Sequence, residues 1–179
     1  MSKIKTICLF LLPLIVAATG IFFFVGNNVL DVYFSPNGGC TSAIIRCIDA
    51  ARSSILIQAY SFTSAPIAAA VVGAKKRGVL VIAILDKGQR TAKYSSADFL
   101  AHSGIETYID SAHAIAHNKI IVIDRSVLIT GSFNFTASAE ERNSENLLVF
   151  SGYRYRPLVK RYIENFELHK GHSVRYYGR

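Results

Sequence analysis

The stretch that most limits how this chain can fold is residues 117–134, which have the pattern H-x-K-x4-D-x6-G-S-x-N. Two short apolar runs rich in β-branched residues flank Asp-Arg-Ser at 124–126. Such runs predict buried strands, and the three polar residues between them are typical of a turn. We therefore predict a β-hairpin centred near Arg125, in which Gly131 lies opposite Lys119.

This hairpin would gather four polar side chains at one place. His117 and Lys119 share a face because strand side chains alternate, and Ser132 and Asn134 arrive beside them from the neighbouring strand. A nucleophile or base, a fixed cation, a hydroxyl and an amide suit a phosphoryl group. Asp124 lies an odd number of residues from His117 and from Lys119, so on a regular strand its side chain points to the other face. We therefore interpret it as a turn and support residue rather than a general base.

The pattern is similar to the motif of the phospholipase D superfamily, and the chain more narrowly resembles small bacterial secreted endonucleases that carry one copy of it. The resemblance covers about residues 33–170. Its other matching segments are Tyr60-Ser61-Phe62-Thr63, Ala74-Lys75-Lys76-Arg77-Gly78, Phe135-Thr136 and Asn143-Ser144-Glu145-Asn146. It implies that His117 forms a phosphohistidine, that Lys119, Ser132 and Asn134 bind phosphate, and that Glu145 orients and charges the imidazole. The candidate catalytic set is His117, Lys119, Asp124, Ser132, Asn134 and Glu145, with Asp124 in its supporting role.

The N-terminus predicts export from the cytoplasm. Residues 6–25 carry no charge and follow Lys3 and Lys5, which is the layout of a signal peptide. The apolar run at 7–25 is also close to the ~20 residues that span a bilayer. Residues 1–26 are therefore a cleaved signal peptide or a membrane anchor, and the protein is periplasmic or secreted, or anchored in the inner membrane and facing the periplasm.

Beyond the leader, residues 29–175 predict one α/β domain, a layered mixed β-sheet flanked by helices of phospholipase D/nuclease-like type. Besides the hairpin, we expect strands at 29–34, 54–60, 79–85, 105–109 and 146–150, and helices at 41–52, 65–77, 95–102 and 156–170.

Charge predicts a polyanionic partner. The formal net charge is +8, and +6 remains once Lys3 and Lys5 are removed with the leader. A basic domain is attracted to nucleic acid or to anionic lipid. The basic loop after the strand at 79–85 offers Lys87, Arg90 and Lys93 as contacts to the substrate backbone, unless it is an ordinary solvated loop.

We expect no metal ion and no cofactor. The sequence has no C-x-x-C pair and no clustered His/Cys set that indicates zinc. Cys40 and Cys47, seven residues apart in a predicted helix, are too distant for a disulfide. His113 is interpreted as a loop residue, and His169 and His172 as surface residues.

The leading functional interpretation is a metal-independent phosphodiesterase that hydrolyses DNA or RNA. Displacement at phosphorus also needs an acid on the far side, and one chain has one motif histidine. A C2 homodimer would supply the second copy, and the resemblance implies the same arrangement. A phospholipase D acting on anionic phospholipids is the alternative, and a non-catalytic polyanion-binding module is a third.

Overall fold

The predicted hairpin is present in the computed structural model, which describes residues 28–179. Strands β5 (Lys119–Ile123) and β6 (Val127–Gly131) pair antiparallel, with Ile123 opposite Val127. This register is centred on Arg125, as predicted. Asp124 and Arg125 have φ values of 50° and 53°, which is the combination that a tight type I′ hairpin turn requires.

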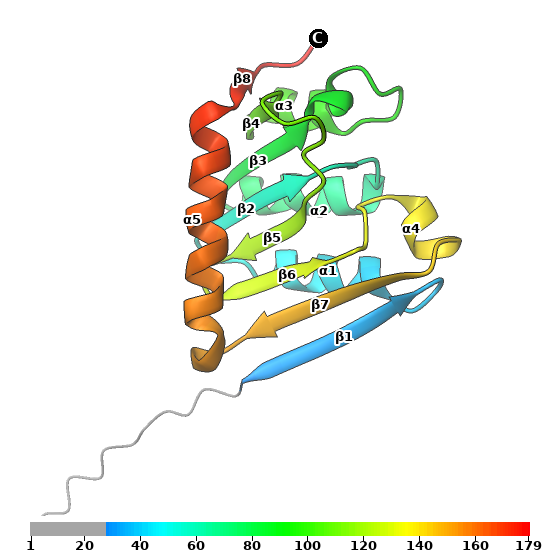
Figure 1. Cartoon of the computed structure of the whole chain (residues 1–179), viewed down its shortest axis with the longest axis vertical. Coiled ribbons are helices and arrows are strands. Elements are labelled where there is room, and N and C mark those ends of the chain that lie inside the picture. Colours follow the sequence, from blue (N-terminus) through cyan, green and yellow to red (C-terminus); the bar gives the residue numbers. More distant parts are fainter. Residues whose placement is uncertain (1–27) are drawn as a thin grey trace, which may run out of the picture.

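The hairpin belongs to an eight-stranded mixed sheet with the order β1-β7-β6-β5-β2-β3-β4-β8 (Figure 1). Strands β2, β3 and β4 are parallel to one another, and the other neighbouring pairs are antiparallel. The remaining strands are β1 (Val29–Ser35), β2 (Ser54–Ala59), β3 (Leu80–Asp86), β4 (Glu106–Asp110), β7 (Glu145–Ser151) and β8 (Val174–Tyr176). The predicted α/β fold with a mixed sheet is therefore confirmed.

Helices cover both faces of this sheet. Helices α1 (Cys40–Asp49), α2 (Ala65–Lys76), α3 (Ala97–His102) and α4 (Ala137–Glu141) contribute to the larger core, and α5 (Arg156–His172) packs on the opposite face. The apolar stripe of α5 is Val159, Ile163 and Phe166, spaced about one turn apart. Because both faces are covered, the central strands β2 and β3 are almost entirely buried, and they are apolar apart from Ser54 and Gln58 in β2 and Asp86 at the end of β3.

All eight strands have a terminus at one end of the sheet. Strands β1, β2, β3, β4 and β6 end there, and β5, β7 and β8 begin there. We call this the site end of the sheet. Strand β1 begins at the opposite end, because Val29 pairs with Ser151 and Ser35 pairs with Glu145.

The structure differs from the sequence prediction in several elements. Strand β8 was not expected, α5 continues to His172, and the basic loop after β3 contains a 3-10 helix, η1 (Lys87–Arg90). The predicted leader, residues 1–26, lies outside the described residues. Within residues 28–179, no helix is both long and apolar enough to cross a bilayer.

Candidate active site

His117 lies at the site end of the sheet, two residues before Lys119, which is the first residue of β5. Its side chain is exposed, and the centroid of its ring is 4.5 Å from that of Tyr60, which follows β2. Lys119 Nζ donates a hydrogen bond of 3.0 Å to the His117 carbonyl oxygen and is 5.1 Å from the Tyr60 ring centroid. The three side chains therefore form one group, in which the tyrosine had no role assigned from the sequence.

Lys119 is the charged centre of this group. It is 7% exposed, and burial lowers the pKa of its ammonium group, while the negative charge of Glu145 acts in the opposite direction. A cation held where water is largely excluded interacts with an anion much more strongly than one on the open surface. The predicted role of Lys119 as a phosphate ligand is consistent with this placement.

Gly131 and Ser132 are placed by a close approach of β6 to β7. The carbonyl oxygen of Asn146 accepts hydrogen bonds from the backbone N–H groups of Ser132 and Phe133, at 3.1 and 3.2 Å. A Cβ added to Gly131, whose φ is 143°, would lie 2.3 Å from that same oxygen. The glycine of the motif is therefore required by the backbone. The Ser132 hydroxyl accepts a hydrogen bond from Asn146 N–H at 3.0 Å.

Asn134 and Glu145 complete the predicted set. The amide oxygen of Asn134 is buried and has no hydrogen-bond partner within the described part of the chain. The Glu145 carboxylate accepts a hydrogen bond of 3.2 Å from Asn143, and residues 28–179 contain no direct hydrogen bond between Glu145 and His117. The family-implied contact between these two side chains is therefore not formed in this single chain.

Asp124 lies at the other end of β5, about 17 Å from Lys119 at the rise of a strand. Its carboxylate accepts hydrogen bonds from the backbone N–H groups of Arg52, Ser53 and Ser54 and from the Ser53 hydroxyl, at 2.7–3.0 Å. Burial alone would raise the pKa of Asp124, but these hydrogen bonds bring it down to about 2. The carboxylate fastens the hairpin turn to the start of β2, which fits the predicted supporting role. It lies far from His117 and Lys119.

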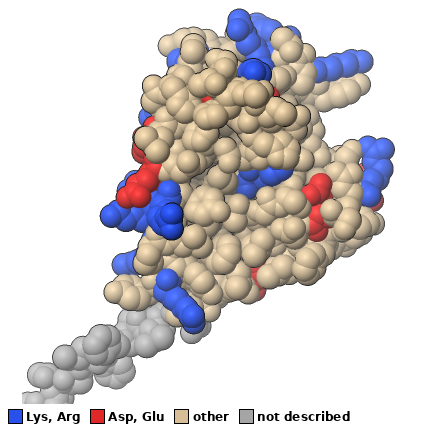
Figure 2. Space-filling view, viewed as in Figure 1, with Lys and Arg blue, Asp and Glu red and all other residues tan. Residues whose placement is uncertain are grey.

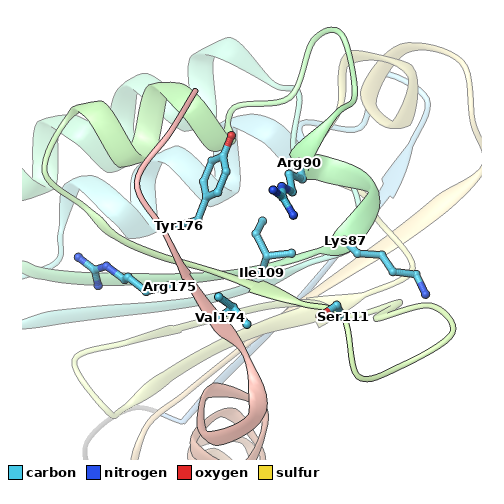
Figure 3. Close-up of a pocket in the computed structure, with 7 residues that line it drawn as sticks. All are labelled: Lys87, Arg90, Ile109, Ser111, Val174, Arg175 and Tyr176. Atoms are coloured by element: carbon cyan, nitrogen blue, oxygen red, sulfur yellow. The ribbon is translucent and has the colours of Figure 1, made fainter.

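The three basic residues of the loop after β3 occupy different positions. Lys87 and Arg90 line a cavity of about 310 Å³, together with Ile109, Ser111, Val174, Arg175 and Tyr176 (Figure 3). Arg90 points toward Ile109 and Tyr176, whereas Lys87 extends away from them. Lys93 lies over the ring of the exposed Tyr94. The Gln89 side chain accepts a hydrogen bond from Phe62 N–H at 3.1 Å, which fastens this loop to the segment after Tyr60.

His113 lies in a loop and His172 is exposed, as expected, but the sequence did not indicate that these two residues and the half-buried His169 come together. All three approach the carboxylate of Asp110, which is fully buried at the end of β4. Burial alone would raise the pKa of Asp110, but hydrogen bonds from the three imidazoles and from Ala112 N–H lower it to about 2. The sequence did contain a signal, two short pairs D-x-x-H and H-x-x-H, but they are separated by more than fifty residues.

Comparisons with known proteins agree with the motif. The sequence matches the family described as cardiolipin synthase, PLD-like domain, over residues 44–170. A phospholipase D of Rickettsia felis is 43% identical over 140 residues, which are 78% of this chain and 68% of that protein. The mitochondrial cardiolipin hydrolase of Mus musculus is 34% identical over 126 residues, 70% of this chain and 56% of that protein.

Solved structures lead to the same family. Nuc of Salmonella typhimurium, a phospholipase D family member, has a TM-score of 0.80 and 36% identity, and the match covers 84% of this chain and 99% of Nuc. NucT of Helicobacter pylori shares the fold, with a TM-score of 0.76 and 22% identity over 84% of this chain and all of NucT. The family match spans most of the described domain and contains the whole H-x-K-x4-D-x6-G-S-x-N pattern. This chain belongs to the phospholipase D superfamily of phosphodiester hydrolases, through a PLD-like domain of the cardiolipin synthase type.

Proposed function

We propose that this protein is a phosphodiesterase that cleaves nucleic acid outside the cytoplasm, through a phosphohistidine at His117 and without a metal ion in the chemical step. The observation that carries the proposal is the exposed imidazole of His117 beside the buried ammonium group of Lys119. An accessible nucleophile next to a fixed, partly desolvated cation suits attack on an anionic phosphodiester.

The reaction proceeds in two displacements at phosphorus. A ring nitrogen of His117 attacks the phosphorus atom, a P–N bond forms, and the P–O bond to one alcohol breaks as that oxygen takes up a proton. Water then attacks the same phosphorus and gives its proton to the group that had protonated the leaving oxygen, the P–N bond breaks, and the imidazole is restored. Lys119 neutralises the non-bridging oxygens in both steps. Asn134 belongs to the same motif, and the N–H₂ of its amide is a donor suited to the non-bridging oxygens.

The acid that protonates the leaving oxygen must approach from the side opposite the nucleophile. We infer that it is His117 of a second copy of this chain, in a C2 dimer whose axis passes through the site. In such a dimer one imidazole begins the reaction as a neutral nucleophile and the other as a protonated acid. The Glu145 carboxylate acts electrostatically on Lys119 within the same site.

Cationic groups near the site favour a polyanionic polymer as substrate. Lys87 and Arg90 follow β3 at the same end of the sheet as His117. Figure 2 shows Lys and Arg in several separate groups over one face, including one recessed near its middle. A nucleic acid carries a phosphate at every nucleotide and can engage several such groups at once, so its binding should weaken steeply with added salt. An anionic phospholipid is the second candidate, because curated relatives are named phospholipase D and mitochondrial cardiolipin hydrolase.

The test is a side-by-side assay of purified protein on supercoiled plasmid DNA, on single-stranded RNA and on vesicles that contain cardiolipin. The proposal expects cleavage of nucleic acid, little or no lipid product, and loss of activity in His117→Asn, which serves as the matched control for contaminating nucleases. Lipid hydrolysis without nucleic-acid cleavage would establish the second candidate. Tight binding of DNA by the wild type without any product would indicate a binding module instead.

A further inference from the structure

A compact group of metal-binding side chains lies where the end of β4 meets the last turn of α5. It consists of Asp110, His113, His169 and His172, and one potential ligand atom from each lies within 4.8 Å of the others. Asp110 is fully buried, and the three imidazoles surround its carboxylate. From this arrangement we propose that the protein binds one Zn²⁺ ion through these four residues, at a structural site separate from the His117 chemistry.

The spacing of the ligand atoms is close to that of a tetrahedral zinc site. Asp110 Oδ2 lies 3.0 Å from His113 Nδ1, 2.7 Å from His169 Nδ1 and 3.3 Å from His172 Nε2. Around Zn²⁺, with bonds of about 2.0–2.1 Å to nitrogen and oxygen, neighbouring ligand atoms in a tetrahedron are about 3.3 Å apart. The whole set of four ligand atoms spans up to 4.8 Å, so a metal ion would need the carboxylate oxygen to shift outward and the most widely separated ligand atoms to shift inward.

The chemical identity of the ligands selects the metal. Three imidazole nitrogens and one carboxylate oxygen form a set that suits zinc and similar borderline ions. Calcium and magnesium prefer oxygen ligands, so a site with three nitrogens does not suit them. The imidazoles of His169 and His172 also lie at the carboxyl end of α5, where the helix dipole favours a positive charge.

Without a metal ion, each ring can donate an N–H to the Asp110 carboxylate as a neutral tautomer, and a Zn²⁺ ion would take the place of these protons. The three rings are packed against one another, with centroids 4.8–5.1 Å apart, around a carboxylate that carries one negative charge. If all three rings were protonated, the repulsion among three cations would exceed what one carboxylate can balance. A divalent cation instead uses the facing nitrogens of neutral rings as ligands, and the carboxylate offsets half of its charge.

Contacts outside the group hold the ligands in place, as outer contacts do in metal sites. Asp110 Oδ1 accepts a hydrogen bond from Ala112 N–H at 3.1 Å. Lys87 Nζ donates to the His113 carbonyl oxygen at 3.0 Å, and the Ser173 hydroxyl donates to the His169 carbonyl oxygen at 2.7 Å. In Figure 1 the end of α5 lies beside β4 and β8, so the metal would tie the segment that leads to His117 to the C-terminal helix.

The experiment uses the full chain, purified without a polyhistidine tag and stripped with a chelator. Zn²⁺ is titrated by calorimetry, Co²⁺ by visible absorption, and Tm is measured with and without Zn²⁺. We expect one ion per chain, the intense visible bands of tetrahedral Co²⁺, and a higher Tm with Zn²⁺. Each readout is independent of catalysis, so failure here leaves the proposed phosphodiesterase activity untouched.

Variants assign the site. His172→Gln changes an exposed ligand and should weaken Zn²⁺ binding at least ~10-fold, and His169→Ala with His172→Ala should weaken it at least ~100-fold, because outer contacts alone are worth 10- to 100-fold. His102→Gln, an exposed histidine on α3 outside the group, is the matched control and should bind as the wild type does. Absence of saturable one-to-one binding in the wild type, or equal binding by His172→Gln and His102→Gln, would overturn the proposal.

Discussion

Replacing Asp124 by asparagine separates a supporting role from a catalytic one. Asparagine has nearly the same shape and tolerates the positive φ of this position, so the change removes the charge and one of the two acceptor oxygens, such as the one that Arg52 N–H uses. The pKa of Asp124, lowered from 3.8 to about 2 by four hydrogen bonds, corresponds to about 2.4 kcal/mol of stability at neutral pH. Partial exposure of the carboxylate reduces this to about 2 kcal/mol. For a domain of this size, Tm should fall by about 4–8 °C.

The sign of the pH dependence follows from the lowered pKa. The stabilisation from Asp124 is fully present above its unfolded pKa of 3.8 and is lost as pH falls toward 2. The difference in unfolding free energy between wild type and Asp124→Asn should therefore be largest above about pH 4 and shrink below it, even though Asp110 titrates in the same range in both proteins.

Denaturant unfolding at several pH values measures this difference, and Asp49→Asn, which removes an exposed carboxylate, is the matched control. Below its Tm, the Asp124→Asn enzyme should turn over within about threefold of the wild type, because the carboxylate lies at the far end of β5. A fall in turnover of a hundredfold with an unchanged Tm would refute the supporting role and place Asp124 in the chemistry.

Four further outcomes are expected. Lys119→Met should lower kcat about a hundredfold or more with the fold kept, since single electrostatic contacts of this kind are worth about 3–4 kcal/mol in the transition state; a loss below tenfold in steady-state assays would contradict it. Gly131→Ala should lower Tm by several degrees and reduce activity, because its Cβ would meet the Asn146 carbonyl oxygen; unchanged melting would refute that account. Activity assayed well below Tm should survive EDTA and gain nothing from added Mg²⁺, since any bound zinc serves the fold and not the reaction. A doubly tagged dimer with one wild-type and one His117→Asn subunit should lose most of its turnover, whereas half of the activity would mean independent sites.

Short-range sequence patterns predicted the β5–β6 hairpin within the sheet. The turn residues at 124–126 and the two apolar runs around them set the hairpin register, because loop length and turn type determine which residues face each other. The alternation of strand side chains also separated Asp124 from His117 and Lys119 on the sequence alone. Most helix and strand positions followed from apolar periodicity, with ends that differ by one to three residues.

What could not be predicted depends on contacts between distant parts of the chain. The pairing of β1 with β7 joins residues more than a hundred positions apart, and β8 is only three residues long. The group around Asp110 forms because α5 returns to the end of β4. Neither the D-x-x-H pair nor the H-x-x-H pair indicates this contact by itself. The packing of Tyr60 against Lys119 and His117 likewise depends on β2 lying beside β5, a neighbour relation that apolar patterns do not specify.

The direction of β1 fixes how the enzyme would be presented if residues 7–25 were retained as an anchor. Val29 lies at the end of the sheet opposite to His117, and the seven residues of β1 span about 20 Å between the two ends. Only a few residues separate such an anchor from Val29, and each extends at most about 3.6 Å. This linker is too short for the domain to rotate freely relative to the bilayer. In that case the end of the sheet that carries His117 would be the end farther from the anchor, about the length of β1 away from Val29.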